Sequence, residues 1–415
     1  MEQAQESTPI YQAYPEGGLK AYSVVLGAWF TLLPASGLLN STGILQAWLF
    51  EHYLIDYTES EISWIFSTFA FLFFFGGFIV AVGPLFDRYG AKRLLPVGAL
   101  GLVASLVATS WCRLYYQFIL SFGGLGGCAC SVLWTTSIAT LGHWFDQNRG
   151  LATGIATTAG GVGGVLFPIV FTQLVGRIGF TWTMNCFALI SAFCLVVGVA
   201  LLKTRLPRSP HASLIMDWRG FKDFRFVLTM SAIFVLDWAV LVPPAYISTY
   251  ASSKGLHSLS QHVLAILNAA SILGRGLPGP IADRIGRFNV MILSSAACTA
   301  SILGLWLNAN SSRAILSAFA VLYGLFSGSV YSLTPVCVAQ LCRSDDYASK
   351  YGTAYGVVSF ATLAGVPVSG SIVDVGGGAN YAALISFCGA AYAASTVLFV
   401  VARGCSIGWG LQAKF

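Results

Sequence analysis

Two ionisable side chains lie inside long apolar runs of the sequence. Asp237 occurs in IFVLDWAVL and Arg275 in ASILGRGLPGP. A charge in the middle of a bilayer costs about 2.5–3.5 kcal/mol on insertion scales, so such residues usually have a functional role. A guanidinium stays ionised and binds a carboxylate through two parallel hydrogen bonds, whereas a buried aspartate can take up and release a proton.

These two side chains allow several interpretations. Arg275 either binds an anionic ligand, or it extends to the cytoplasmic face or pairs with a loop acid such as Asp283. Asp237 either exchanges a proton when an anion displaces it from Arg275, or forms a structural pair that holds two helices together. Candidate residues that line the same region are Asn40, Tyr331 and Tyr355.

A charged pattern occurs twice, about half a chain apart. GPLFDRYGAKR begins at Gly83 and GPIADRIGRFN begins at Gly279, and their aspartates are 196 residues apart. An aspartate near a helix end can cap N–H groups of a neighbouring helix and pair with arginines. We therefore predict charged loops that close one end of the molecule and release it. The candidate gating residues are Gly83, Asp87, Arg88, Gly90, Arg93, Asp283, Arg284, Gly286 and Arg287.

The composition defines the elements that must position these residues. Of the 415 residues, 56% are hydrophobic and only 9% are charged, against about 25% charged in soluble proteins. Runs of about 20 apolar residues form membrane-spanning helices, because lipid excludes open sheet edges. We predict an all-α integral membrane protein with twelve transmembrane helices in two six-helix halves. The runs lie near 21–47, 61–83, 93–111, 114–142, 150–176, 181–202, 224–250, 259–282, 288–309, 313–341, 349–373 and 380–402.

The distribution of basic residues predicts the topology. With both termini inside, seventeen Lys and Arg residues fall in cytoplasmic segments and four in outer loops, and Arg275 is the remaining one of the 22. Positive residues favour the cytoplasmic side, so we expect both termini to be cytoplasmic. We expect the protein to reside in the plasma membrane. The polar segment at the midpoint is expected to be a linker. The predicted units are a first bundle (1–202), the linker (203–223) and a second bundle (224–415).

Motifs of enzymes and cofactor sites are missing from the sequence. It contains no GxxxxGK[ST] phosphate loop, no GxSxG or HExxH motif and no paired-cysteine metal spacing. The basic residues are scattered over short loops, which disfavours nucleic acid as a partner. We expect no enzymatic activity, no cofactor and no metal, and a protein that functions as a monomer in the lipid bilayer.

The two charged loops, with their position and duplication, resemble the signature loop of the major facilitator superfamily. Shorter stretches resemble its monocarboxylate-porter branch: EGG at Glu16–Gly18, and HWFDQNRGLATGIATTAGGVGG at His143–Gly164. TPVCVAQL, Thr334–Leu341, is similar to fungal members. Animal members of the branch carry a lysine where this chain has Asn40, which points to a fungal relative with a different substrate.

The resemblance implies a secondary transporter that works by alternating access between the two halves. The expected substrate is an organic anion, either a monocarboxylate-like solute or an acidic secondary metabolite. Arg275, Asn40, Tyr331 and Tyr355 would contact it, and Asp237 would couple its movement to protons. Two alternatives stay open: efflux of a larger neutral or amphipathic fungal metabolite, and a transporter-like sensor that moves nothing.

Overall fold

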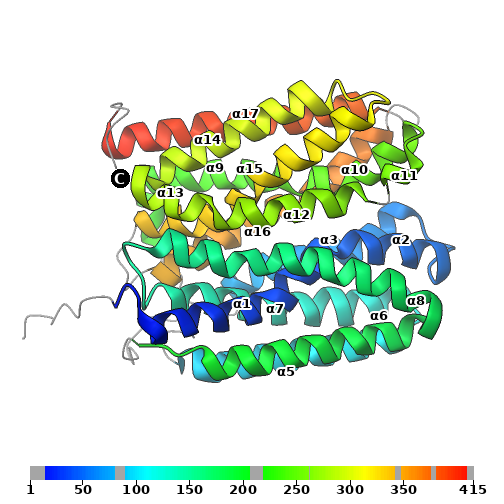
Figure 1. Ribbon diagram of the computed structural model, residues 1–415, viewed down its shortest axis with the longest axis horizontal. Helices are drawn as coiled ribbons and strands as arrows, with labels where there is room; N and C mark the ends of the chain where they lie inside the picture. Colours follow the sequence, from blue (N-terminus) through cyan, green and yellow to red (C-terminus); the bar gives the residue numbers. More distant parts are fainter. Residues whose placement is uncertain are drawn as a thin grey trace, which may run out of the picture.

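The computed structural model describes residues 15–79, 89–205, 218–260, 262–341, 347–374 and 380–408. Within these ranges the chain forms helices and connecting turns, with no strand. The helices run side by side along the long axis of the molecule (Figure 1), and the first and last described residues lie at the same end. We call this end the terminal face.

The first half of the chain occupies one side of the bundle (Figure 1). Its helices are α1 (Gly18–Asn40), α2 (Thr42–His52), α3 (Glu59–Ile79), α5 (Ala91–Trp111), α6 (Tyr115–Phe118), the π-helix η1 (Ile119–Gly126), α7 (Gly127–Leu141) and α8 (Arg149–Leu201).

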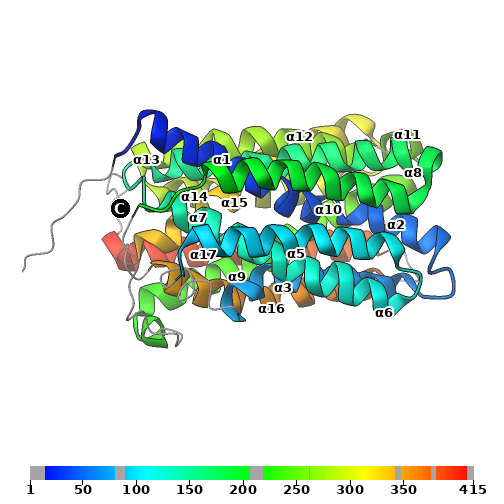
Figure 2. The ribbon, with the colours of Figure 1, turned by 90° about the horizontal axis from the view of Figure 1, so that it is seen from below.

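The second half occupies the other side (Figure 1) and lies behind the first half when the molecule is seen from below (Figure 2). It begins with the 3₁₀ helix η2 (Trp218–Lys222), and its helices are α9 (Phe224–Val240), α10 (Val242–Ser253), α11 (His257–Ser260), α12 (Val263–Gly276), α13 (Pro278–Ile285), α14 (Arg287–Ser301), the π-helix η3 (Ile302–Trp306), α15 (Arg313–Gln340), α16 (Tyr347–Asp374) and α17 (Tyr381–Ile407).

These helices make up the twelve predicted spans. Nine helical stretches of the described chain are long and apolar enough to cross a membrane. One of them, α8, contains two spans, because Gly179 has a φ of 76° and reverses the chain within it. The remaining two spans are α3, whose apolar part is Glu61–Gly76, and the broken helix α11–α13. The predicted twelve-helix fold is confirmed.

Two glycines show the internal duplication at the level of the backbone. Gly90 and Gly286 immediately precede α5 and α14, the third span of each half, and have φ values of 72° and 101°. They are 196 residues apart, as are the aspartates of the two charged loops. A positive φ is easily adopted only by glycine, which explains why the repeated pattern keeps a glycine at this position.

Adjacent prolines explain the break in the seventh span. Pro243 and Pro244 have no N–H to donate to the carbonyls one turn earlier, and the helix divides at Leu241 into α9 and α10. The hydroxyl of Tyr323 donates to the carbonyl of Val240 (3.1 Å). A neighbouring helix thus satisfies a backbone group that the prolines leave without a partner, as membrane helices require.

Small residues allow the two halves to approach closely along α8. Figures 1 and 2 show α12 and α13 beside α8. A Cβ at Gly150 would lie 2.7 Å from the Gly279 carbonyl, and a Cβ at Gly279 would collide with the Gly150 carbonyl. A Cβ at Gly161 would lie 2.7 Å from the side chain of Ile272. We call the contact of α8 with α12 and α13 the α8–α12 seam; it extends from the terminal face toward the middle of the bundle.

We predict that Gly279→Val opens the seam at the terminal face, because backbone atoms of α8 cannot move aside as a flexible side chain can. The measurement is the rate at which a thiol reagent modifies a cysteine placed at buried Thr157, and this rate should rise. Gly304→Val is the matched control, since a Cβ at Gly304 meets nothing within 4 Å. An unchanged rate in Gly279→Val would contradict this description of the seam.

Candidate functional site

Arg275 lies in the α8–α12 seam, near the end of α12. Its side chain is 2% exposed, and one guanidinium nitrogen, Nη1, donates to the backbone carbonyl of Thr157 on α8 (3.2 Å). The guanidinium carbon lies 4.7 Å from the ring centre of Tyr331 on α15. The buried Nε has no hydrogen-bond partner. The bonds that Arg275 makes therefore leave part of its donor capacity unused.

No carboxylate pairs with Arg275 in the described part of the chain. The salt bridges found there join Arg225 to Asp223 and Arg287 to Asp283. Asp237 on α9 is 5% exposed, and its Oδ2 has no hydrogen-bond partner. The structural pair considered from the sequence is thus not formed in this conformation. Tyr331 lies close enough to both Arg275 and Asp237 to interact electrostatically with each.

Asn40 lies next to Arg275 but bonds within its own half. Its amide nitrogen donates to the carbonyl of Gly160 on α8 (2.8 Å). A Cβ at Gly160 would collide with the Arg275 guanidinium and would lie 2.9 Å from Ser36 Oγ. The glycine therefore lets a donor from α1 and the cation from α12 reach the same turn of α8.

Tyr355 belongs to a different contact between the halves. Its ring packs on Tyr351 of the same helix, α16, with centres 4.5 Å apart, and on Phe74 of α3, with centres 5.6 Å apart. The indole N–H of Trp134 on α7 donates to the Tyr351 hydroxyl (3.1 Å). These aromatic side chains close the α3–α16 contact, whereas Arg275 contacts α8 and α15.

Asp283 and Arg287 of the second charged loop hold the first half at the terminal face. The Asp283 carboxylate accepts from the backbone N–H groups of Gly150 (3.1 Å) and Leu151 (2.9 Å), at the start of α8. Arg287 donates to the backbone carbonyl of Asp146 (2.7 Å), and its Nε lies 3.5 Å from Asp283. Arg284, in contrast, is exposed. We call the Asp283 and Arg287 contacts the terminal clasp.

The first charged loop is described only in part. Gly83, Asp87 and Arg88 lie outside the described residues. Arg93 is exposed and its guanidinium lies 5.8 Å from the ring centre of Tyr89. The gating roles assigned to this loop from the sequence stay predictions.

A second carboxylate lies just before α8, that of Glu16, whose bonding partners the sequence does not reveal. Glu16 accepts from the backbone N–H groups of Asp146 (2.7 Å), Gln147 (2.8 Å) and Asn148 (3.0 Å). Burial raises the pKa of Glu16, but these bonds and the Asn148 side chain together lower it further, so the pKa lies below its ordinary value. The EGG motif therefore supplies a carboxylate that binds the turn preceding α8 and places a negative charge near the positive end of that helix.

Asn268 is a further polar residue of the seam that the sequence analysis overlooked. It lies on α12, two turns before Arg275, and is 4% exposed. Its amide nitrogen donates to the carbonyl of Gly164 on α8 (3.2 Å). The signal that could have identified it is a lone amide in an apolar helix, seven residues from the intramembrane arginine.

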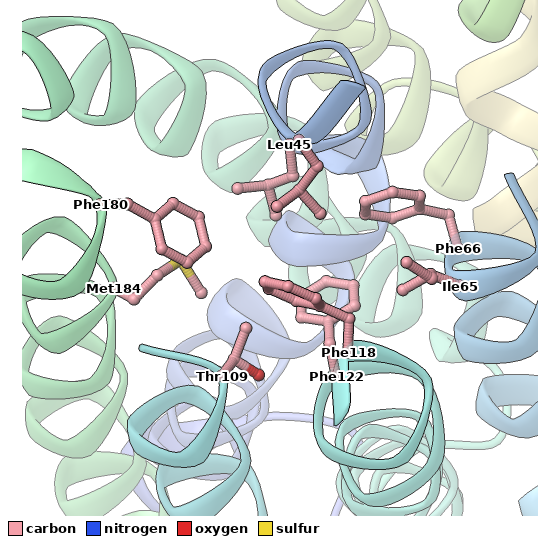
Figure 3. A pocket seen from close by; sticks show the side chains of 9 residues that line it. Leu45, Ile65, Phe66, Thr109, Phe118, Phe122, Phe180 and Met184 are labelled. Carbon is pink, nitrogen blue, oxygen red and sulfur yellow. The ribbon is translucent and has the colours of Figure 1, made fainter. Parts of the chain in front are cut away.

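An apolar pocket in the first half is too small to be the substrate site. It has a volume of about 10 Å³ (Figure 3), room for about one water molecule. Apart from Thr109, only apolar side chains line it, so it has no group that would bind a charged ligand. Its lining residues are Leu45, Leu49, Ile65, Phe66, Thr109, Phe118, Phe122, Phe180 and Met184.

Comparison with known proteins identifies the family. The chain matches the Major Facilitator Superfamily over residues 21–307 and 227–406. It is 35% identical to an MFS-type transporter of Gibberella moniliformis over 94% of this chain and 92% of that protein. It is 31% identical to the riboflavin transporter MCH5 of Saccharomyces cerevisiae (98% and 82%). It is 34% identical to the aspyridones efflux protein apdF of Emericella nidulans (89% and 75%).

A solved structure supports the same fold. The human organic anion transporter MFSD10 superposes with a TM-score of 0.71, over 92% of this chain and 100% of that one, at 17% sequence identity. The helix arrangement, the duplicated glycine turns and the relatives along nearly the whole chain agree. The chain is a multi-pass integral membrane protein and belongs to the Major Facilitator Superfamily.

Proposed function

We propose that this protein moves an organic anion across a membrane by alternating access, and that Arg275 binds the anionic group. The observation that carries the proposal is the environment of Arg275. The guanidinium is buried, it has one backbone acceptor, and no carboxylate pairs with it in the described chain.

The buried charge of Arg275 needs compensation. A buried cation is usually paired or otherwise compensated, because moving it out of water is costly. Here a single carbonyl and the face of Tyr331 provide only part of that compensation. An anionic substrate provides the rest through charge-assisted hydrogen bonds, which are about twice as strong as neutral ones.

The structure supports a cycle in which this conformation is closed at the terminal face. The terminal clasp and the α8–α12 seam join the two halves there. The excess of basic residues in the loops of this face favours the cytoplasmic side. In the proposed cycle, Asp283 leaves the start of α8 when the halves rock apart, and Arg275 leaves the Thr157 carbonyl and faces the opened cavity.

Two relatives favour a metabolite over a simple monocarboxylate. They are named for riboflavin and for aspyridones. We therefore favour an acidic secondary metabolite as the substrate. Efflux of a neutral or amphipathic metabolite is the second candidate, and the same relatives support it.

We predict that Arg275→Gln lowers the transport of the acidic substrate by about tenfold to a hundredfold, the loss expected for charge-assisted hydrogen bonds. Arg275→Lys should keep part of the activity, because it keeps the charge but not the planar fork. The measurement is uptake of a labelled organic-acid panel into vesicles that contain the purified protein.

Arg313→Gln is the matched control for this experiment, since Arg313 is exposed at the start of α15. It should transport like the wild-type protein. Equal transport of every anion by Arg275→Gln and the wild-type protein would refute the anion assignment and leave the neutral metabolite as the candidate.

We further propose that Asp237 couples transport to protons. Asp237→Asn keeps the shape of the side chain but cannot ionise, so we predict that a pH gradient no longer accelerates uptake while exchange of internal for external substrate continues. Asp223→Asn is the control, because that carboxylate is partly exposed and pairs with Arg225 beside it. Full stimulation by the gradient in Asp237→Asn would exclude this role.

A further inference from the structure

Asn268 and Arg275 make the same kind of contact across the α8–α12 seam. Each donates through a terminal nitrogen to a backbone carbonyl of α8: Asn268 to Gly164 (3.2 Å) and Arg275 to Thr157 (3.2 Å). The two donors are seven residues apart on α12, and the two acceptors are seven residues apart on α8. Seven residues span about two helical turns. The two hydrogen bonds therefore lie about 10 Å apart along the seam.

Both donors lose their acceptors in the same movement. The carbonyls belong to the first half and the donors to the second, so separation of the halves breaks both hydrogen bonds. Asn40 differs from them, because its bond to Gly160 lies within the first half and survives the movement. The opened seam therefore presents two donors on one face of α12, a cation and a neutral amide.

We propose that Asn268 is a second substrate contact and that the substrate is an elongated anion with a hydrogen-bond acceptor, such as a carbonyl oxygen, about 10 Å from its acidic group. This inference rests on the proposed function, because it takes Arg275 as the site of the acidic group. It goes further by specifying a length and a second polar group, which a small monocarboxylate does not have.

The reason is that a buried donor without a partner destabilises the state in which it occurs. A small carboxylate satisfies Arg275 and leaves the Asn268 amide without an acceptor. A longer anion that carries a carbonyl two helical turns away satisfies both donors. In the open, substrate-bound state, hydrogen bonds to the substrate then replace the two that break when the seam opens.

A series of ω-acetamido carboxylates tests this spacing. The probes are N-acetylglycine as the short acid, 8-acetamidooctanoate as the long one, and undecanoate as an apolar chain of equal length. Affinity for the purified protein in nanodiscs is measured by the change in tryptophan fluorescence. We expect 8-acetamidooctanoate to bind about tenfold more tightly than undecanoate, the factor that one added hydrogen bond commonly contributes.

The variant Asn268→Ala should remove this tenfold difference and leave the affinity for N-acetylglycine unchanged. Ser271→Ala is the matched control: it lies on the same helix and is buried, but its hydroxyl bonds to the Asn268 carbonyl within that helix (2.8 Å). The comparison of the three probes in the wild-type protein tests the inference even if the variant folds poorly.

Equal affinity for 8-acetamidooctanoate and undecanoate in the wild-type protein overturns the inference, as does an equal loss for all acids in Asn268→Ala. Failure of the proposed function gives a different result. In that case Arg275→Gln binds N-acetylglycine as well as the wild-type protein does, whatever happens at Asn268.

Discussion

A guanidinium buried between the two halves, without a carboxylate partner in the described chain, is the constraint on which the rest of this structure depends. Arg275 is compensated by a carbonyl of the opposite half and by the face of Tyr331. In the proposed cycle the halves separate and the carbonyl is lost. The open state is then favourable only when an anion takes the place of the carbonyl, and the substrate supplies the differential stabilisation that a population shift requires.

The architecture of α8 follows from this requirement. A cation can reach the Thr157 carbonyl only if side chains of α8 do not hold the helices apart, and Gly160 and Gly161 meet that condition. Small residues let membrane helices pack closely, and the packing and the interhelical hydrogen bonds together hold them. In the proposed cycle these individually modest contacts are the ones that break when the seam separates.

The start of α8 shows how closure at the terminal face is balanced. Two carboxylates lie near this helix end: Asp283 of the second half accepts from N–H groups of the first turn of α8, and Glu16 of the first half accepts from those of the turn before it. When Asp283 leaves in the proposed cycle, Glu16 still compensates the positive end of the helix dipole. Opening therefore frees the N–H groups of Gly150 and Leu151 for water, while a carboxylate stays near the helix end.

Much of the fold could be predicted from the sequence, because span length, basic loops and the repeated Asp-Arg-x-Gly pattern are local features. The intramembrane charges Asp237 and Arg275 were also visible, since any charge stands out in an apolar run. The bonding partners of such residues could not be predicted from the sequence. That Arg275 bonds to a backbone carbonyl, that Asn268 matches it two turns away, and that Glu16 binds the turn before α8 all depend on contacts between segments more than 100 residues apart.

The most direct test of the central claim is the distance between the two halves at the terminal face, measured by electron–electron double resonance in nanodiscs. One spin label is placed at Lys92, exposed at the start of α5, and the other on native Cys405, exposed at the end of α17, with the other cysteines replaced. We predict a shorter distance without ligand than with it, because a population at longer distance should grow when a transported anion is added. In Arg275→Gln the distances should no longer respond to the anion. A wild-type distance that ignores every anion, or an unchanged response in Arg275→Gln, would contradict the account.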